Sequence, residues 1–497
     1  MKLHSIIVKL LLLCLLNGTS LWAALTLFSL KNYGPMILLL VTTALIDFIY
    51  LSRRTRASRW LIPGTILLVI FQIYPVLYTA VTAFSNYSTG HSISRDEAID
   101  GLIKQNTNLV ENGAQFQFKV VEDGNRKALL TTNLADGRFA LADSETFTPL
   151  PSEQVPDGWR EVTMERLREP EFQKWLTELS VPYTASTVIR VESFETASEY
   201  RYLLRYDSTQ DKMIDIGSGE ALAEKDGAFF YSDGTELEPG WRIWVGFKNF
   251  TDVITNDRVR GPFFRVLVWT FAYAILSVLT TFILGLLLAT TLNTPRIRGQ
   301  RFLRSVLIIP YAIPGFLSIL IWAGLLNDDF GMLNRALGTS IPWLFDAEWA
   351  KVSTLLVNLW LGFPYMFLVT TGALQSIPSE LAEAAEVDGA TPRQAFTKIK
   401  LPLLLVTIAP LLIGSFAYNF NNFGGIYLLT GGGPAMNDSD VAGATDILIS
   451  YTYKLAFASG KGAQYGLATA VSIIIFFIVA SVSALSFRRT RALENLN

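Results

Sequence analysis

Charged residues are scarce in this sequence, and their absence is uneven. Only 17% of the 497 residues are charged, whereas a soluble protein usually carries about 25%. The uncharged parts are separate runs of roughly 20 apolar residues, the length that crosses a hydrocarbon core about 30 Å thick. The pattern predicts a polytopic membrane protein in contact with the lipid bilayer. Its positive charges gather at membrane edges and not on one soluble face, so no nucleic-acid partner is expected.

Several chemical groups are also missing. Cys14 is the only cysteine, so any external domain must fold without an intrachain disulfide. The interiors of the third to eighth apolar runs hold no Asp, Glu, Lys or His, which counts against a proton-coupled carrier or an ion pump. No G-x-x-x-x-G-K-[ST] phosphate loop occurs, and the glycine-rich segments at Gly431 and Gly460 lack that spacing. We therefore expect no cofactor in this chain and no enzyme activity of its own.

Eight apolar runs are predicted to span the membrane as helices: 5–28, 34–51, 60–84, 264–292, 302–325, 352–375, 403–429 and 466–487. The first run has features of a signal peptide, but it is long and a second run follows almost at once, so we expect it to be retained. These runs divide the chain into two N-terminal spans with a basic loop (1–59), a third span (60–84), a polar insertion (85–245) and a membrane core (246–497).

Arginine-rich loops indicate the orientation of the spans. They are 52–59, 293–304 and 487–491, and with eight crossings all three fall on one side. The positive-inside rule makes that side cytoplasmic. Both termini are then cytoplasmic, and so is the charged loop 376–402.

The polar insertion has the alternation of β-strands. Its short stretches FQFKVV, ALLTTNL, GRFALAD, TVIRVESF, YRYLLRYD and GAFFYSDG are bounded by glycine-rich turns. A helix is expected at 169–180. At roughly 160 residues the insertion is large enough for a core of its own. It is predicted to be a β-rich extracytoplasmic domain, either a structural cap or a docking surface for a soluble partner.

Neutral polar residues recur at helical spacing in the sixth and seventh runs. They are Asn358, Gly362 and Tyr365 in one, and Ser415, Tyr418, Asn419 and Asn422 in the other. Amides and hydroxyls hydrogen-bond to sugar hydroxyls, and aromatic faces stack on the apolar side of a pyranose. The alternative is hydrogen bonding between helices, which membrane proteins use routinely. Two matched faces favour a pathway for a neutral, polyhydroxylated solute.

The charged loop EAAEVDGATPRQAFTKIKLPLL interrupts two apolar runs. Ser379 can cap a first helix, Gly389 suits the position just past its end, and Pro392 suits the first turn of a second helix. The pattern predicts a helix-turn-helix across the cytoplasmic mouth. An amphipathic loop resting on lipid headgroups is the alternative.

This loop resembles the EAA loop of the membrane subunits of bacterial ABC importers. The matching positions are Glu383, Ala384, Ala385, Gly389, Ile399, Leu401 and Pro402. In that family the loop is a pair of coupling helices that fits into a cleft on an ATPase subunit. The resemblance implies the same role for these residues here.

Further segments resemble carbohydrate permeases: FSNYS, GFKNF, PYAIPGFLSILIW, NNFGGIYLLTGGGP and YTYKLAF. With eight spans and a large insertion after the third, the chain resembles the F-type membrane subunit of maltose/maltodextrin importers. That family implies an all-α type I importer core of eight helices, with a β-rich extracytoplasmic domain between helices three and four. It also implies a bacterial inner-membrane location and several partners: a G-type second permease subunit, a homodimeric ATPase that binds ATP and Mg, and a periplasmic maltose-binding protein that contacts the insertion.

The resemblance also implies a sugar site in mid-membrane. Its positions correspond to Asn358, Leu361, Gly362, Tyr365, Ser415, Tyr418, Asn419 and Asn422. Where the familiar maltose pattern has phenylalanine, this chain has Tyr418; the stacking ring survives, but the added hydroxyl can change which sugars fit.

The sequence thus predicts the transport-channel subunit of an ATP-driven maltose or maltodextrin importer that works by alternating access. Three alternatives remain open. The solute can be another di- or oligosaccharide. The chain can be a membrane sensor with an external ligand domain, although that leaves the polar faces unexplained. A membrane enzyme would need carboxylates near a span end, where only Asp328 and Asp329 are adjacent.

Overall fold

The computed structural model describes residues 3–52, 58–124, 126–184, 186–293, 299–436, 441–457 and 462–494. Most of the basic loop 52–59 and residues 294–298 of the second basic loop lie outside this set. The chain forms two compact units, residues 1–81 and residues 82–497.

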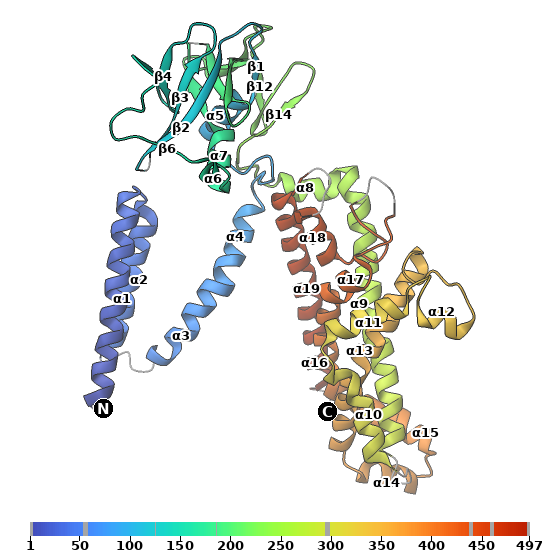
Figure 1. Cartoon of the computed structure of the whole chain (residues 1–497). Helices are drawn as coiled ribbons and strands as arrows, with labels where there is room; N and C mark the ends of the chain where they lie inside the picture. Colours follow the sequence, from blue (N-terminus) through green and yellow to red (C-terminus); the bar gives the residue numbers. More distant parts are fainter. Residues whose placement is uncertain are drawn as a thin grey trace. The chain divides into compact units, whose positions relative to one another are not determined.

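The first unit begins with a helical hairpin. Helices α1 (Leu3–Ser29) and α2 (Tyr33–Leu51) lie side by side (Figure 1). The Ser20 and Thr43 hydroxyls join them across 2.7 Å, and Asn17 Nδ2 donates to Asp47 Oδ1 at 3.1 Å. Polar pairs of this kind hold helices together where lipid offers no hydrogen-bond partner.

The third span is one continuous helix with an irregular middle. It consists of α3 (Ser58–Leu68), the π-helical turn η1 (Val69–Ile73) and α4 (Tyr74–Thr82). Pro75 lies two residues after the end of the π-helical turn and has no N–H to donate to that turn. A wider turn accommodates such a break without ending the helix.

The insertion is β-rich, as predicted. Its large sheet has the order β5-β4-β3-β2-β9-β8-β7, with β1 paired to β9 and β6 paired to β2, all antiparallel. The strands are β1 (Thr107–Leu109), β2 (Gln115–Asp123), β3 (Arg126–Asn133), β4 (Phe139–Ala142), β5 (Phe147–Leu150), β6 (Arg160–Glu161), β7 (Ser180–Pro182), β8 (Thr187–Val191) and β9 (Thr196–Tyr202).

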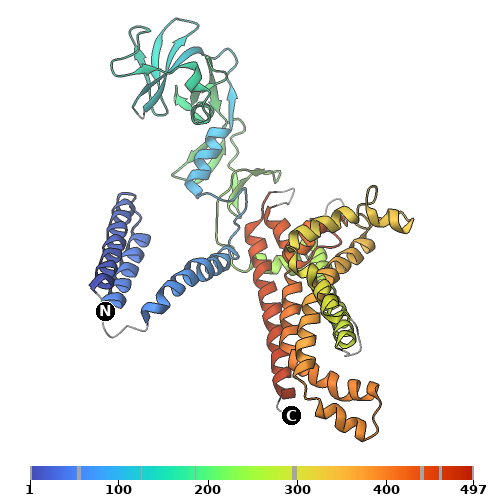
Figure 2. The same ribbon diagram turned by 60° about the horizontal axis from the view of Figure 1, so that its bottom comes forward.

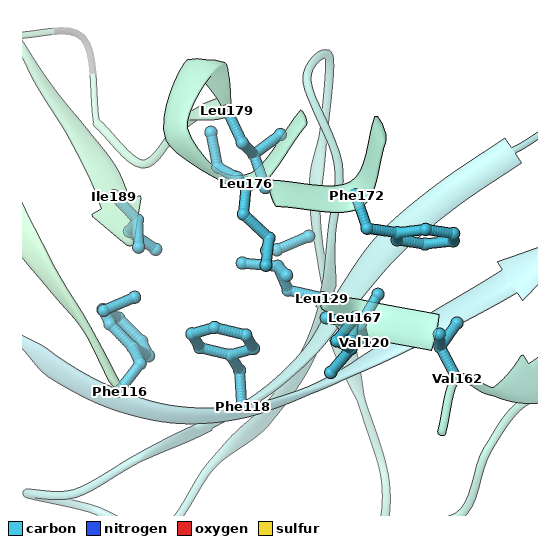
Figure 3. Packing of buried hydrophobic residues seen from close by; sticks show 13 residues of the cluster. Phe116, Phe118, Val120, Leu129, Val162, Leu167, Phe172, Leu176, Leu179 and Ile189 are labelled. Carbon is cyan, nitrogen blue, oxygen red and sulfur yellow. The ribbon is translucent and has the colours of Figure 1, made fainter. Parts of the chain in front are cut away.

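Alternate residues of β2 point into the core of this sheet. Phe116, Phe118 and Val120 face the helices α6 (Met164–Leu167) and α7 (Pro170–Glu178) (Figure 3). The predicted helix at 169–180 is therefore confirmed. Its buried side chains, with the sheet, give the insertion an apolar core without any disulfide.

A second, smaller cluster combines a helix that precedes the large sheet with strands that follow it in the sequence. It contains α5 (Arg95–Gln105) and the strands β10 (Leu204–Asp207), β11 (Lys212–Asp215), β12 (Ala223–Lys225), β13 (Ala228–Phe230) and β14 (Glu236–Leu237). The prediction omitted α5. Ser94 and Glu97 form a reciprocal capping box at its start, a signal that the sequence did carry.

The membrane core is built on two long helices. α9 (Asp257–Leu292), which follows α8 (Lys248–Thr255), packs along α13 (Ala347–Ser376). The buried face of α9 is a stripe of small residues: Thr270, Ala274, Ser277, Thr281, Gly285 and Ala289. A Cβ on Gly285 would lie 2.7 Å from backbone atoms of Met366 and Phe367, so the two backbones are in close contact. Small residues permit such an approach between membrane helices.

The fifth predicted span is not one straight helix. α10 (Gln300–Ala312) and α11 (Gly315–Leu325) meet at a bend of 91°. Pro314 supplies no N–H and restricts Ile313 before it to extended backbone, which explains the break. The short α12 (Met332–Leu337) follows.

The seventh predicted span is also interrupted. α16 (Leu401–Phe420) ends at Phe420 with Asn421 as its C-cap, and a separate helix α17 (Phe423–Thr430) follows. The chain continues through α18 (Leu448–Phe457) to α19 (Tyr465–Glu494). Among the described residues, seven helices are long and apolar enough to cross a membrane, or eight when the bent pair counts as one span.

Candidate functional site

Three asparagine side chains from two predicted faces converge in the membrane core. Asn358 on α13 donates from Nδ2 to Asn419 Oδ1 on α16 at 3.0 Å, and its own Oδ1 accepts from Asn422 Nδ2 at 3.3 Å. Asn358 and Asn419 are buried, with 9% and 7% of their surface exposed. The structure therefore brings together the amides of Asn358, Asn419 and Asn422 from the two predicted faces.

Asn422 reaches this network by a route that the sequence pattern did not predict. A continuous helix was expected through Ser415, Tyr418, Asn419 and Asn422, but α16 ends two residues before Asn422. Asn422 is instead the N-cap of α17, where its Oδ1 accepts from the Gly425 N–H at 3.1 Å. Asparagine favours both roles because its side chain competes with the backbone for hydrogen bonds.

The network includes one residue that sequence reasoning missed. The Tyr273 hydroxyl on α9 lies 3.4 Å from Asn422 Nδ2, and its side chain is 1% exposed. Its signal was present, since Tyr273 falls between Thr270 and Ser277 on the same buried stripe of α9 at helical spacing. α9, α13, α16 and the start of α17 thus contribute to one neutral polar centre.

Four other predicted site positions are Ser415, Tyr365, Leu361 and Tyr418. Ser415 accepts the second bond of the Asn419 amide through its backbone carbonyl at 2.8 Å. Tyr365 is half-buried on α13, and Leu361 packs against the cluster around Trp343. Tyr418 is 70% exposed, and among the described residues its hydroxyl has no hydrogen-bond partner.

Gly362 has a packing role that is visible in the structure. A Cβ at this position would lie 2.9 Å from Thr281 Cγ2 on α9. The glycine therefore allows α13 to approach α9 beside the polar centre. Its proposed contact with sugar is a separate prediction.

The polar centre can bind a neutral solute without a change in charge. Each primary amide offers two N–H donors and two acceptor lone pairs, and the bonds described above leave part of that capacity unused. α16 carries no acidic or basic side chain. In the described part of the chain, no three His, Cys, Asp or Glu side chains are grouped closely enough to hold a metal ion.

The charged loop forms the helix-turn-helix that its sequence predicted. α14 (Glu380–Val387) and α15 (Pro392–Ala395) project at the end of α16 (Figure 2), followed by the π-helical turn η2 (Phe396–Lys400). Gly389 has φ of +81°, the left-handed conformation that suits the residue past a helix end.

The first helix of the loop begins differently from the prediction. Ser379 occupies the N-cap position in α-helical conformation and makes no capping bond. The second helix has a full capping box, in which Thr391 and Gln394 bond to each other's backbone N–H. Ala385 and Ala395 are buried, which closes the two short helices against each other.

The matched loop positions fall on distinct parts of this hairpin. Glu383 and Ala384 are exposed on α14, beside the buried Ala385. Ile399 lies in η2, and Leu401 and Pro402 begin α16. The hairpin is thus directly continuous with the helix that carries Asn419.

The GGGP segment also has a structural role, centred on a buried carboxylate. Asp446 is fully buried and accepts from the Gly443 N–H at 2.6 Å, from Ser450 Oγ at 2.8 Å and from Lys454 Nζ at 2.6 Å. Burial raises the pKa of Asp446, and Lys454 offsets part of that rise. A Cβ on Gly432 would overlap the Asp446 carboxylate, so only glycine lets the loop close over this ion pair.

Known proteins resemble the chain along nearly its whole length. It is 33% identical to the maltose/maltodextrin transport system permease protein MalF of Vibrio vulnificus, over 97% of this chain and 94% of that protein. The chain belongs to the maltose/maltodextrin transport permease family. The permease of Salmonella typhimurium is likewise 33% identical, over 92% of this chain and 91% of that protein.

Family profiles match three parts of this permease. Residues 258–489 match the binding-protein-dependent transport system inner membrane component, and residues 66–144 match the N-terminal region of the transmembrane subunit in such ABC transporters. Residues 12–55 match a domain of unknown function. The chain is therefore a multi-pass permease subunit of an ABC transporter.

Among solved structures, a bacterial ABC transporter that imports the acidic polysaccharide alginate is 25% identical to this permease. Its match covers 50% of this chain and 84% of that chain, with a TM-score of 0.44.

Proposed function

We propose that this permease forms the sugar pathway of an ATP-driven importer of maltose and maltodextrins. The observation that carries the proposal is the convergence of Asn358, Asn419 and Asn422 on a neutral centre between three helices. The relatives that span 97% of the chain are named for maltose/maltodextrin transport. A sugar needs many neutral hydrogen bonds and no charge, and this centre supplies them.

Sugar recognition follows from exchange of hydrogen bonds. The amides hydrogen-bond to one another, which lowers the cost of placing polar groups in the membrane. A sugar hydroxyl both donates and accepts, so it can replace one amide partner without leaving a group unpaired. Tyr365 and Tyr418 supply rings for the apolar face of a pyranose. Leu361, Gly362 and Ser415 complete the proposed lining.

The energy for transport is proposed to come from a partner. The chain carries no phosphate-loop motif, so we assign ATP and Mg to a homodimeric ATPase and no cofactor to this chain. The ATPase cleft receives the α14–α15 hairpin, with Glu383, Ala384, Ala385 and Gly389 at the contact and Ile399, Leu401 and Pro402 leading into α16. Movement of the hairpin then shifts α16 and with it Asn419.

Two further partners and an orientation complete the proposal. A G-type second permease subunit closes the pathway, and a periplasmic maltose-binding protein docks on the insertion domain. The arginine-rich loops support cytoplasmic termini and a cytoplasmic α14–α15 hairpin. Alternating access requires that sugar bind the outward and inward states with different affinity.

The test is uptake of radiolabelled maltose by proteoliposomes that contain this chain, the second permease subunit and the ATPase. Uptake that requires both internal ATP and the loaded binding protein is expected. Uptake without ATP would contradict the assignment of the α14–α15 hairpin to coupling. ATP-dependent uptake of a different oligosaccharide, with maltose excluded, would keep the importer and replace the solute; the exposed hydroxyl of Tyr418 is the observation that favours this second candidate.

A further inference from the structure

Buried hydrogen bonds tie the end of α17 to the start of α18. The hydroxyls of Thr430, the last residue of α17, and Thr445 are 2.7 Å apart. The Thr445 hydroxyl also donates to the Gly433 carbonyl at 2.7 Å, and its side chain is fully buried. We call these contacts and those of the adjacent carboxylate the α17 lock; its side chains are Thr430, Thr445, Asp446, Ser450 and Lys454.

Asp446 holds the lock in one arrangement. Its carboxylate accepts from the loop at the Gly443 N–H and from α18 at Ser450 and Lys454, so it joins the loop after α17 to α18. A buried carboxylate strongly disfavours any arrangement that leaves it without these donors. Thr445, the preceding residue, is thereby held in position to meet the end of α17.

The lock is also attached to α9, close to the polar centre. Trp269 Nε1 on α9 donates to the Thr445 carbonyl at 3.2 Å. Tyr273 lies one turn farther along α9, with its ring centroid 6.0 Å from that of Trp269, and its hydroxyl contacts Asn422. The same stretch of α9 therefore contacts the lock at one end of α17 and Asn422 at the other.

α17 connects the lock to the polar centre. Its eight residues make a helix about 12 Å long, with Asn422 as the N-cap and Thr430 as the last residue. Ile426 and Leu429 are buried against the neighbouring helices, which holds α17 from the side. The backbone bonds of a short helix are internal, so its two ends move together. A shift at Thr430 is therefore passed to Asn422.

We propose that Thr445 and Asp446 are positioning residues for sugar binding, because they hold α17 where its N-cap places the Asn422 amide in the polar centre. This inference rests on the proposed function and adds to it a control of the site from the far end of α17. Both residues act through the helix and not by contact with the sugar. A lock that only stabilises the loop is the alternative that the experiment must exclude.

Maltose binding to the complete complex, held in its ATP-bound state by a non-hydrolysable analogue, tests the lock. Thr445→Val keeps the side-chain shape and removes the hydroxyl, so it should raise the Kd for radiolabelled maltose about threefold to tenfold, the range of one lost hydrogen bond. Thr445→Ser restores the hydroxyl and should bind as wild type. Thr131→Val is the matched control, since it removes a fully buried hydroxyl that donates to the Ala140 carbonyl in the insertion domain. It should lower thermal stability without changing the Kd.

A double-mutant cycle tests whether the lock acts through Asn422. Asn422→Ser keeps a side chain that can cap α17 and removes the amide. In that background Thr445→Val should change the Kd by less than about twofold, because the group that it would misplace is already absent. Ser450→Ala, which removes one donor to Asp446, should raise the Kd in the wild-type background and follow the same pattern in the cycle.

The outcomes separate this inference from the proposed function. A wild-type complex that binds no maltose would overturn both. If the wild type binds, an unchanged Kd in Thr445→Val, an equal loss in Thr131→Val, or the same factor in the Asn422→Ser background would overturn the positioning role and leave the importer intact. A loss that Thr445→Ser restores and that Thr131→Val does not show supports the positioning role, and its disappearance in the Asn422→Ser background supports the route through α17.

Discussion

Asn358 on α13 donates a hydrogen bond to Asn419 on α16 across 3.0 Å, although 61 residues separate them in the chain. Both side chains are buried, and each has a second polar contact. The bond ties α13, which packs on α9, to α16, which continues from the α14–α15 hairpin. The Asn358–Asn419 pair can therefore link the two helices, belong to a sugar site, or do both.

Leucine substitutions separate these roles. Asn358→Leu or Asn419→Leu alone leaves a buried amide without its partner, which should cost about 1–3 kcal/mol of stability. The double variant removes both amides and should recover part of that stability, as measured by thermal unfolding of the purified complex. If the pair only links helices, maltose uptake should recover with stability; we predict that it does not recover.

The hydroxyl of Tyr418 should affect specificity more than stability. It is 70% exposed and has no hydrogen-bond partner among the described residues, so Tyr418→Phe should leave thermal stability unchanged. Loss of one hydrogen bond to sugar would change KM about twofold to tenfold. Uptake of maltose and of other disaccharides should be compared in the two proteins. An identical profile would remove Tyr418 from the site.

Close contact between α9 and α13 predicts a graded response to added methyl groups. Gly285→Ala places a Cβ against the backbone at Met366, which cannot move aside, while Gly362→Ala meets only the Thr281 side chain. Gly285→Ala should therefore lower the thermal stability more. Gly372→Ala on α13 has open space around its Cβ and is the control; it should be neutral or slightly stabilising. An equal loss at all three positions would contradict this packing.

Variants of the α14–α15 hairpin should fold and insert but transport poorly. Glu383→Lys reverses an exposed charge on α14, and Gly389→Pro replaces a φ of +81° by the fixed negative φ of proline. Both variants should insert normally, yet maltose uptake should fall at least about tenfold, equivalent to 1.4 kcal/mol of coupling. Glu348→Lys, an equally exposed acid at the start of α13, should not change coupling. Normal uptake by both hairpin variants would refute the coupling role.

Acid should destabilise the insertion domain. Hydrogen bonds from the Ser94 N–H and hydroxyl lower the pKa of Glu97, and the Tyr206 hydroxyl and Arg95 lower that of Asp211. The folded state then binds fewer protons than the unfolded state, so stability is present at neutral pH and is lost as pH falls below about 4.

Glu97→Gln isolates one of these contributions. The variant should unfold at a lower temperature than wild type at pH 7, and the difference should disappear near the acid limit. Glu145→Gln changes an exposed carboxylate in a turn of the same domain and is the control. A difference that persists unchanged at low pH would show that Glu97 acts through packing and not through its charge.

Much of the fold was predictable from local pattern. Apolar runs gave most of the spans, and Gly389 with Pro392 gave the turn of the hairpin. Period-two alternation gave β2, β3, β4, β8 and β13, while the predicted stretch 200–207 covers the end of β9 and all of β10. Each of these features is decided by residues close together in the chain. The exact boundaries of the four predicted regions of the chain stay predictions.

The breaks in the spans and the contact of Tyr273 with Asn422 were harder to predict. Hydropathy does not register the break at Asn421 or the bend at Pro314, because the residues directly on both sides of each break are mainly apolar. Tyr273 joins Asn422 only through the packing of α9 beside α17, which no local pattern specifies. Helical spacing placed Asn358 and Asn419 on two polar faces, but the hydrogen bonds between the amides and the capping role of Asn422 required the structure.

Binding of radiolabelled maltose to the complete complex, held in its ATP-bound state by a non-hydrolysable analogue, tests the central claim most directly. The account predicts saturable binding that competes with unlabelled maltodextrin and is lost in the Asn358→Leu/Asn419→Leu variant while the complex remains assembled. Binding that the double variant retains at full affinity would contradict the assignment of this centre as the sugar site.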